Sequence, residues 1–229
     1  MTCPETQSAR RWIFLSHILS PQTPADGGGR GLAVDTTRSI ASGDSSNSVT
    51  LSFSNHLGTH VDAPRHFVVD GKTVDAYGAG DWIFTKVFVA DIPVNEGAVV
   101  DIPQVEAALA TCKDADLLLL RTGFESRRGG DSYWATSPGF DPALCSYLKR
   151  RLPSLSAIGM DTISISSMKH RDMGRAAHWE FLGADVRIFE DMALAGAPAA
   201  DNLDQVMAMP LRFDNADGTP CTIVGTIIR

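Results

Sequence analysis

The sequence lacks the paired cysteines that mark thiolate metal sites and disulfide scaffolds. Its four cysteines are scattered over 229 residues, and none falls in a CxxC pair. Disulfide frameworks are typical of small secreted domains, and thiolate zinc sites need closely spaced ligands. We therefore expect reduced, mostly buried thiols in a cytoplasmic protein. The four residues are Cys3, Cys112, Cys145 and Cys221.

Long apolar runs and an excess of basic residues are also missing. The four leucines at 117–120 suit a buried strand, whereas a membrane-spanning helix needs about 20 apolar residues. The apolar stretch near the start is too short for a secretory signal. Twenty Lys and Arg against 27 Asp and Glu give a net charge of −7, which argues against nucleic-acid or membrane partners. A small-molecule substrate remains as the expected partner.

No internal repeat or long linker divides the chain, so we expect a single domain over residues 1–229. The glycine-rich stretch 20–31 predicts a loop. Cap and proline signals predict three helices, the second beginning at Asp141 and the third ending at a Gly183 cap. The predicted helices span 101–112, 141–151 and 172–183. The predicted strands span 12–18, 48–54, 86–92, 116–122, 155–161, 186–189, 206–213 and 221–228.

Two parts of this pattern indicate how the elements connect. Strand 116–122, helix 141–151 and strand 155–161 are in the order of a βαβ unit. The last two strands flank "DNADGTP", which is a strong turn signal and predicts a hairpin. We therefore predict a mixed α/β fold with more strand than helix.

Three of only six histidines lie in "HLGTHVDAPRHF", residues 56–67. Pro64 and Gly58 argue against a helix here, and in an extended chain His60 and Asp62 would share a face. His56 would then lie about 13 Å from His60, so the chain must bend, which Gly58 permits. Imidazole and carboxylate ligands together suit zinc, manganese or iron(II). A metal site explains this clustering better than a solvated turn does.

Further ligands must come from elsewhere, because a metal needs about four protein groups or a water. His178 lies on the predicted helix 172–183, and Glu190 follows the strand after it. Glu180 and Asp191 are competing carboxylates that their spacing does not exclude. The remaining histidines, expected at the surface or beside the first strand, are His17 and His170.

The segment "HLGTHVDAPRH" resembles the signature HxGTHxDxPxH of the cyclase family of metal-dependent hydrolases, which includes bacterial kynurenine formamidase and isatin hydrolase. Every fixed position matches, and weaker resemblances include "LLLRTG" at 118–123 and "IFEDM" at 188–192. The resemblance implies a swivelling β/β/α fold with a strand-rich mixed sheet. It also implies a homo-oligomer, either a dimer or a tetramer.

The resemblance further implies a set of metal ligands. His56, His60 and Asp62 would hold a first ion. Asp62 would bridge to a second ion completed by His178 and Glu190, although other branches of the family use one ion. Zinc or manganese is the expected metal.

The implied chemistry is hydrolysis of an amide, formamide or lactam C–N bond by metal-activated water, with His66 as the acid–base residue. Imidazole suits this role because it changes charge near neutral pH. Thr59 would orient a ligand or water, or else form a local backbone bond. The alternatives are a metal-dependent cyclase or dehydratase on the same site, and a non-enzymatic protein with a structural metal.

The sequence leaves the substrate open. The formamidase pattern has a tryptophan in the opening loop, where this chain reads "TPADGGG". Arg121, Arg171 and Arg175 are candidates for holding a substrate carboxylate, although a solvated or structural role is the better explanation of each. Aromatic residues that would line a pocket or pack in the core are Phe67, Trp82, Phe84 and Trp179.

Overall fold

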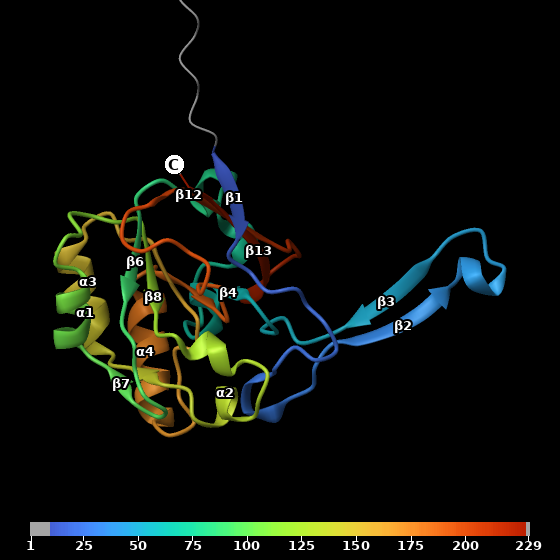
Figure 1. Ribbon diagram of the computed structural model, residues 1–229, viewed down its shortest axis with the longest axis horizontal. Coiled ribbons are helices and arrows are strands. Elements are labelled where there is room, and N and C mark those ends of the chain that lie inside the picture. The colour runs from blue at the N-terminus through green and yellow to red at the C-terminus, as the bar shows by residue number, and fades with distance from the viewer. Residues whose placement is uncertain (1–9, 228–229) are drawn as a thin grey trace, which may run out of the picture.

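The computed structural model describes residues 10–227, and its main element is a nine-stranded mixed sheet (Figure 1). The strand order is β5-β12-β13-β4-β11-β10-β8-β6, and β1 also pairs with β13. This confirms the predicted strand-rich α/β fold. The strands are β1 (Arg11–Phe14), β4 (His60–Asp62), β5 (Ile83–Phe84), β6 (Val87–Asp91), β8 (Leu117–Arg121), β10 (Ala157–Met160), β11 (Arg187–Glu190), β12 (Leu203–Pro210) and β13 (Gly218–Ile227).

One half of the sheet is parallel and is covered by helices. Strands β6, β8, β10 and β11 run parallel, and α1 (Ile102–Ala108), α3 (Ala143–Arg151) and α4 (Arg171–Gly183) lie together beside them (Figure 1). The predicted βαβ unit is therefore β8-α3-β10. Leucines alternate along β8 between two apolar cores, so both faces of this strand are buried.

The other half of the sheet is antiparallel. The predicted hairpin is present as β12 and β13. Strand β13 also pairs with β4, where Gly218 lies opposite Asp62, and β4 pairs on its other edge with β11. The short strand β4 therefore joins the two halves of the sheet, and the residues of the histidine motif lie at this junction.

A two-stranded ribbon projects from the body of the molecule (Figure 1). It consists of β2 (Ala33–Arg38) and β3 (Ser48–Ser52), which pair only with each other among the described residues. The strand predicted at 48–54 is thus real but lies in the ribbon, and β2 was not predicted. Smaller unpredicted elements are β7 (Val99–Val100), β9 (Gly139–Phe140) and α2 (Ser132–Ala135).

Several predicted boundaries differ from the structure. Strand β1 ends at Phe14 rather than residue 18, because the backbone N–H of His17 donates to the hydroxyl of Thr59 instead of to a strand. Helix α4 runs through Gly183, and Asp185 adopts the left-handed conformation that was expected of a glycine cap. Helix α3 begins after Pro142, with the Asp141 carboxylate accepting from the N–H of Ala143.

Other expectations concern the whole chain. Cys112, Cys145 and Cys221 are buried and free, whereas Cys3 lies outside the described residues. Within residues 10–227, no helix combines the length and the apolar character that crossing a bilayer would require. The single domain over residues 1–229 stays a prediction.

Candidate metal centre

The backbone of the histidine motif bends as its sequence predicts. Gly58 has a φ of 70°, and this left-handed turn brings the His56 ring to 5.2 Å from the His60 ring, centroid to centroid. An added Cβ at Gly58 would lie 2.6 Å from the Leu19 side chain, so this position has neither the conformation nor the space for another residue. His60 and Asp62 follow on β4 and share one face of it.

Strand pairing and a helix supply the distal groups. The antiparallel register of β4 and β11 places Glu190 directly opposite His60. His178 lies on the buried face of α4. Its Nε2 atom lies 3.4 Å from Oε1 of Glu190 and 3.5 Å from Oδ2 of Asp62. The five groups expected to bind metal therefore lie together, although residues 62 and 178 are far apart in the sequence.

The two carboxylates lie between two imidazoles. Nε2 of His60 is 3.4 Å from Oδ1 of Asp62 and 3.4 Å from Oε2 of Glu190. His178 faces the other oxygen of each carboxylate. Each carboxylate thus turns one oxygen toward each imidazole. Nδ1 of His56 lies 2.8 Å from Oδ1 of Asp62, on the His60 side.

These separations fit a divalent metal. Ligand atoms that surround a tetrahedral zinc at about 2.1 Å lie about 3.4 Å from one another. The four distances from His60 and His178 to the carboxylates are 3.4–3.5 Å, longer than good hydrogen bonds. Oδ2 of Asp62 is buried and has no hydrogen-bond partner. A buried carboxylate oxygen without a partner is costly, and a cation would satisfy it.

Hydrogen bonds on the outer side of each ligand fix its orientation. Nδ1 of His60 lies 2.8 Å from the carbonyl oxygen of Gly58, and Nδ1 of His178 lies 3.0 Å from that of Gly174. Each ring therefore keeps its Nδ1 proton and turns Nε2 inward. Oε1 of Glu190 accepts from the Ile165 N–H at 2.7 Å. Ligand atoms held in this way lose little freedom when an ion binds.

The electrostatics of the cluster are those of a preformed cation site. Burial alone would raise the pKa of Asp62, but the adjacent imidazoles of His178, His56 and His60 hold it well below its usual range. Burial and the nearby Asp62 charge raise the pKa of Glu190, but His178 and His60 outweigh them and lower it to about 2. Burial lowers the pKa of His178, whereas the two carboxylates raise it to about 10. Without a metal, protonated imidazoles take the place of the cation.

The competing carboxylates lie elsewhere. Glu180 is exposed on the outer side of α4. Asp191 is buried, but its carboxylate accepts two hydrogen bonds from Arg128, at 2.8 and 2.7 Å, and one from Tyr133 at 2.6 Å. The hydroxyl of Thr59 donates to the backbone carbonyl of Asp191, which is distant in the sequence, so this threonine forms neither the expected bond to a ligand nor the expected local backbone bond.

His66 lies at the outer edge of the cluster, in a short 3-10 turn that begins at Pro64. One of its ring nitrogens lies within 4.8 Å of ligand atoms of Asp62 and His178. Its side chain is 29% exposed, so a substrate could reach it. Phe67 stacks on the His178 ring, with centroids 4.5 Å apart, and meets His66 edge-on. Of the four aromatic candidates, Phe67 is the one that contacts the cluster.

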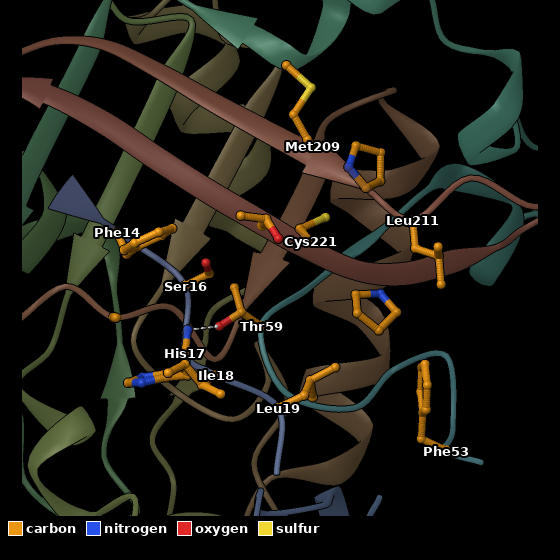
Figure 2. Close-up of a pocket in the computed structure, with 14 residues that line it drawn as sticks. Phe14, Ser16, His17, Ile18, Leu19, Phe53, Thr59, Met209, Leu211 and Cys221 are labelled. Carbon is orange, nitrogen blue, oxygen red and sulfur yellow. Dashed lines mark hydrogen bonds between the residues drawn. The ribbon is translucent and has the colours of Figure 1, made fainter. Parts of the chain in front are cut away.

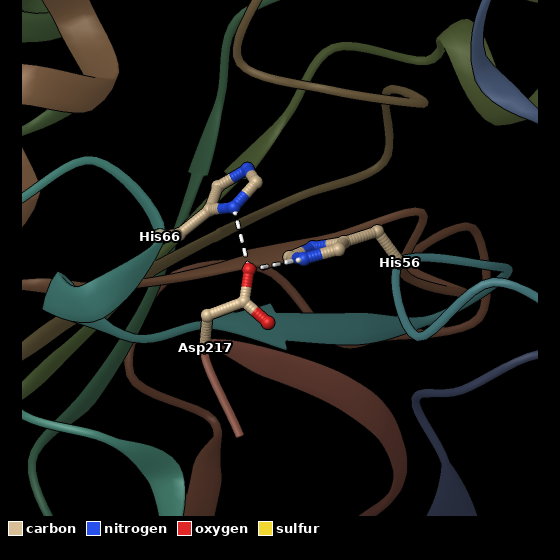
Figure 3. Close-up of side chains that lie close together, drawn as sticks. All are labelled: His56, His66 and Asp217. Atoms are coloured by element: carbon tan, nitrogen blue, oxygen red, sulfur yellow. Dashed lines mark hydrogen bonds and ion pairs between the residues drawn. The ribbon is translucent and has the colours of Figure 1, made fainter. Parts of the chain in front are cut away.

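Sequence reasoning missed Asp217, which lies in the turn before β13 (Figure 3). Its Oδ2 atom lies 3.1 Å from Nε2 of His56 and 3.0 Å from Nδ1 of His66. The turn segment "DNADGTP" was interpreted only as a connection between strands. Aspartate is common in turns for local reasons, so its residue type did not separate Asp217 from Asp214.

Two cavities lie near the cluster. The smaller, of about 250 Å³, borders Ser166, whose hydroxyl lies 3.3 Å from Nδ1 of His178. Its lining is charged and polar: Asp26, Ser166, Ser167, Met168, Arg171 and Arg175. The larger, of about 950 Å³, is an open apolar groove on the β1–β13 flank (Figure 2). None of the five expected ligands lines either cavity, but Ser166 contacts His178, so the smaller cavity is the one that borders the cluster.

The remaining candidates divide by their contacts. Arg121 is held by Asp91 and by the carbonyl oxygen of Leu194, so it has a structural role. Trp82 and Phe84 pack in the core, and Trp179 is 62% exposed. Nε2 of His170 lies 3.0 Å from the carbonyl oxygen of Gly97, and His17 lies beside β1.

Comparisons with known proteins agree with this architecture. A kynurenine formamidase of Geobacillus thermodenitrificans is 28% identical over 214 residues, covering 91% of this chain and 94% of the relative. Isatin hydrolase A from Labrenzia aggregata, bound to benzyl benzoate, superposes with a TM-score of 0.82 at 23% identity, covering 96% of this chain and 94% of that one.

A second isatin hydrolase, bound to the product analogue thioisatinate, superposes with a TM-score of 0.83 at 18% identity, covering 96% and 93% of the two chains. These likenesses to solved structures establish the fold. Residues 13–167, more than half of the chain, match the family described as putative cyclase. The chain belongs to the cyclase family.

Proposed function

We propose that this protein is a metal-dependent hydrolase that cleaves the C–N bond of a small amide, formamide or lactam. The observation that carries the proposal is the pair of carboxylates, Asp62 and Glu190, each turned toward both His60 and His178. A divalent ion bound there would acidify a water and polarise a carbonyl group. The named activities of the kynurenine formamidase and isatin hydrolase relatives support the same reaction class.

The proposed ligand assignment is the one that the family resemblance implies, and the side chains lie close enough together to provide it. His56, His60 and Asp62 would hold one ion, and Asp62, His178 and Glu190 would hold a second. Because each carboxylate turns one oxygen toward His60 and the other toward His178, two ions would fit the cluster better than one. The mixed nitrogen and oxygen ligands suit zinc or manganese.

His66 would move the proton in this reaction. It lies beside the ligand cluster, and its partly exposed ring can contact both a water and a substrate. As general base it would take a proton from the attacking water, and as general acid it would return that proton to the leaving nitrogen. Protonating the nitrogen matters because an amide anion is a poor leaving group.

The surroundings of the cluster suggest a polar, partly aromatic substrate. Phe67 offers an apolar face next to His178. Arg171 and Arg175 line the smaller cavity and could hold a substrate carboxylate, whereas Asp26 on the opening loop could hold a cationic group. The loop lacks an aromatic residue, but Trp134 of α2 lies against it at Gly28, so an aromatic ring is available from another element.

The metal and the reaction can be tested together. Protein purified without added metal should contain at least about half an equivalent of zinc or manganese, as expected of such a ligand set. Formanilides, lactams and isatin should then be screened with and without chelator. Chelator-sensitive hydrolysis is expected. Finding neither metal, with none taken up on incubation, would contradict the metal site, and ring closure or water loss instead of hydrolysis would indicate the cyclase or dehydratase alternative.

We also propose a homo-oligomer, a dimer or tetramer, in which the β2–β3 ribbon contacts a second copy of the chain. Val34 pairs with Leu51, so their side chains share one face of the ribbon, and each is more than 40% exposed. An isolated two-stranded ribbon is marginally stable in water. The groove of Figure 2 joins the ribbon at Phe53 and is lined by further exposed apolar side chains. Two copies related by a two-fold axis could place each ribbon in the other's groove.

The two faces of the ribbon provide a matched test. Leu51→Asp places a charge on the apolar face, whereas Thr50→Asp places it on the opposite face, beside Asp35. Light scattering after gel filtration should find Leu51→Asp dissociated and Thr50→Asp still associated. A monomeric unsubstituted protein, or equal behaviour of the two variants, would contradict the proposed interface.

The proposed location is the cytoplasm. Cys112, Cys145 and Cys221 are buried free thiols, which is typical of proteins in reducing compartments. Mass spectrometry after alkylation under denaturing conditions should find these three thiols unoxidised in protein taken from its own cells.

A further inference from the structure

Asp217 lies between two histidines that have different proposed roles. One oxygen, Oδ2, is within hydrogen-bond distance of His56 on the metal side and of His66 on the substrate side, at 3.1 and 3.0 Å (Figure 3). The two rings stack with centroids 4.1 Å apart. A single carboxylate oxygen therefore fixes the orientation of a proposed ligand and of the proposed acid–base residue.

The carboxylate is itself held in place. Its other oxygen, Oδ1, accepts from the side-chain amide of Asn55 at 2.8 Å, and the same amide nitrogen donates to the Gly218 carbonyl at 3.0 Å. The backbone carbonyl of Asp217 accepts from Ala63 at 2.9 Å. An added Cβ at Gly218 would lie 2.3 Å from the His56 ring, so only glycine lets the ring approach this turn. The turn is thus built around the rings.

These contacts determine which ring nitrogens keep a proton. A carboxylate only accepts, so Nε2 of His56 and Nδ1 of His66 must both donate to Asp217. Without a metal, Nδ1 of His56 also donates, to Oδ1 of Asp62 at 2.8 Å, so a bound ion would displace that proton while Nε2 keeps its own for Asp217. On His66 the nitrogen left with a lone pair is Nε2. A metal ligand and a general base both need a free lone pair.

We propose that Asp217 is a positioning residue that sets the tautomers of both His56 and His66. The inference rests on the proposed function for the role of His66, but the tautomers themselves can be measured without a substrate. His56, His66 and Asp217 also lie close enough to hold an ion of their own. In that arrangement Asp217 would be a ligand, and the two histidines would present lone pairs to the ion instead of protons to the carboxylate.

Asp217→Asn separates these arrangements, because Asn55 determines how the new amide lies. The Asn55 nitrogen donates toward the Oδ1 position, so the amide oxygen of the variant must lie there. Its NH₂ group then points at the rings and requires them to accept. Both tautomers should invert. The variant should bind its first zinc at least about tenfold more weakly, and its kcat should fall by about 10²–10⁴ with a smaller change in KM.

The measurement is long-range ¹H–¹⁵N NMR of the zinc-loaded protein, in which protonated and unprotonated ring nitrogens have different shifts. Asp214→Asn, an exposed change in the same turn, is the matched control and should leave spectrum, affinity and rate unchanged. In Asp217→Asn with Asn55→Asp, the new carboxylate accepts the amide protons and turns the amide oxygen back to the rings. This double variant should restore both tautomers and most of the affinity.

Unchanged tautomers in Asp217→Asn, or a folded, zinc-loaded double variant in which both tautomers remain inverted, would overturn the proposal. Zinc loss with unchanged tautomers would indicate that Asp217 is a ligand. If the tautomers invert as expected but the unsubstituted protein hydrolyses no amide, the positioning role stands and the proposed function fails.

Discussion

The site has a buried inner part and an open outer part, and the two are built differently. The side chains of His60, Asp62, His178 and Glu190 are at most 6% exposed, and they come from a strand, a helix and a strand of the main sheet. The outer side chains lie on turns and are 20–38% exposed: His56, His66 and Asp217. Rigid elements hold the four buried groups at fixed distances, whereas turns hold the groups on the more open side of the site, including His66, which would meet the substrate.

The largest expected difference between these parts is in metal content. Asp62→Asn removes the charge that faces three imidazoles and also removes one bridging oxygen, so nearly all bound metal should be lost. His66→Ala should keep its metal but lose activity by about 10²–10⁴, the usual contribution of a general acid–base group. Elemental analysis and initial rates on both variants give the comparison. Equal loss of metal in both would mean that His66 is a ligand.

The next effect tests the inner part alone. Glu190→Gln keeps the size of the side chain but removes a charge that faces both His60 and His178. Metal affinity should fall at least about tenfold, the scale of losses seen even for groups behind the ligands. Glu180→Gln, exposed on α4, is the matched control and should change nothing. If the control loses metal and Glu190→Gln does not, the distal ligand is assigned to the wrong residue.

The same division explains what could be predicted from the sequence. The inner ligands stand in recognisable patterns: His60 and Asp62 in a dense motif, His178 on an amphipathic helix, and Glu190 at the end of an apolar strand. Their meeting depends on the register of β4 with β11, which spacing alone does not fix. The family resemblance favoured Glu190 over Asp191 as the ligand. In the structure the Asp191 carboxylate is bound by Arg128 instead of facing the cluster.

The outer part and the ribbon were harder to predict. Asp217 could not be recognised from the sequence, because aspartate is common in turns for local structural reasons. The strand β2, "AVDTTR", is short and mostly polar, and it buries none of its residues, so no apolar pattern indicated it. For Asp217 the information lies in a contact between distant parts of the chain, residues 56 and 217.

The smallest effect is a count of protons released when metal binds. In the metal-free protein, burial lowers the pKa of His178 but the carboxylates raise it to about 10, and the pKa of His60 is likewise raised well above its usual value. Both imidazoles are therefore charged at pH 7 and must lose a proton to bind an ion. Glu190, with a pKa of about 2, is already ionised and releases none.

Metal uptake at pH 7 should thus release about two protons, or three if His56, whose pKa is also raised, joins them. Because protons compete with the metal, metal affinity should rise with pH between about 5 and 9. Each proton released should add about a tenfold increase in affinity per pH unit. Calorimetry in buffers of different ionisation enthalpy measures the count. Glu190→Gln should bind metal with fewer protons released, since it removes a charge that keeps both imidazoles protonated. Metal uptake that releases no protons would mean that the inner imidazoles are neutral beforehand, and the effect of burial on their pKa would then outweigh that of the two carboxylates.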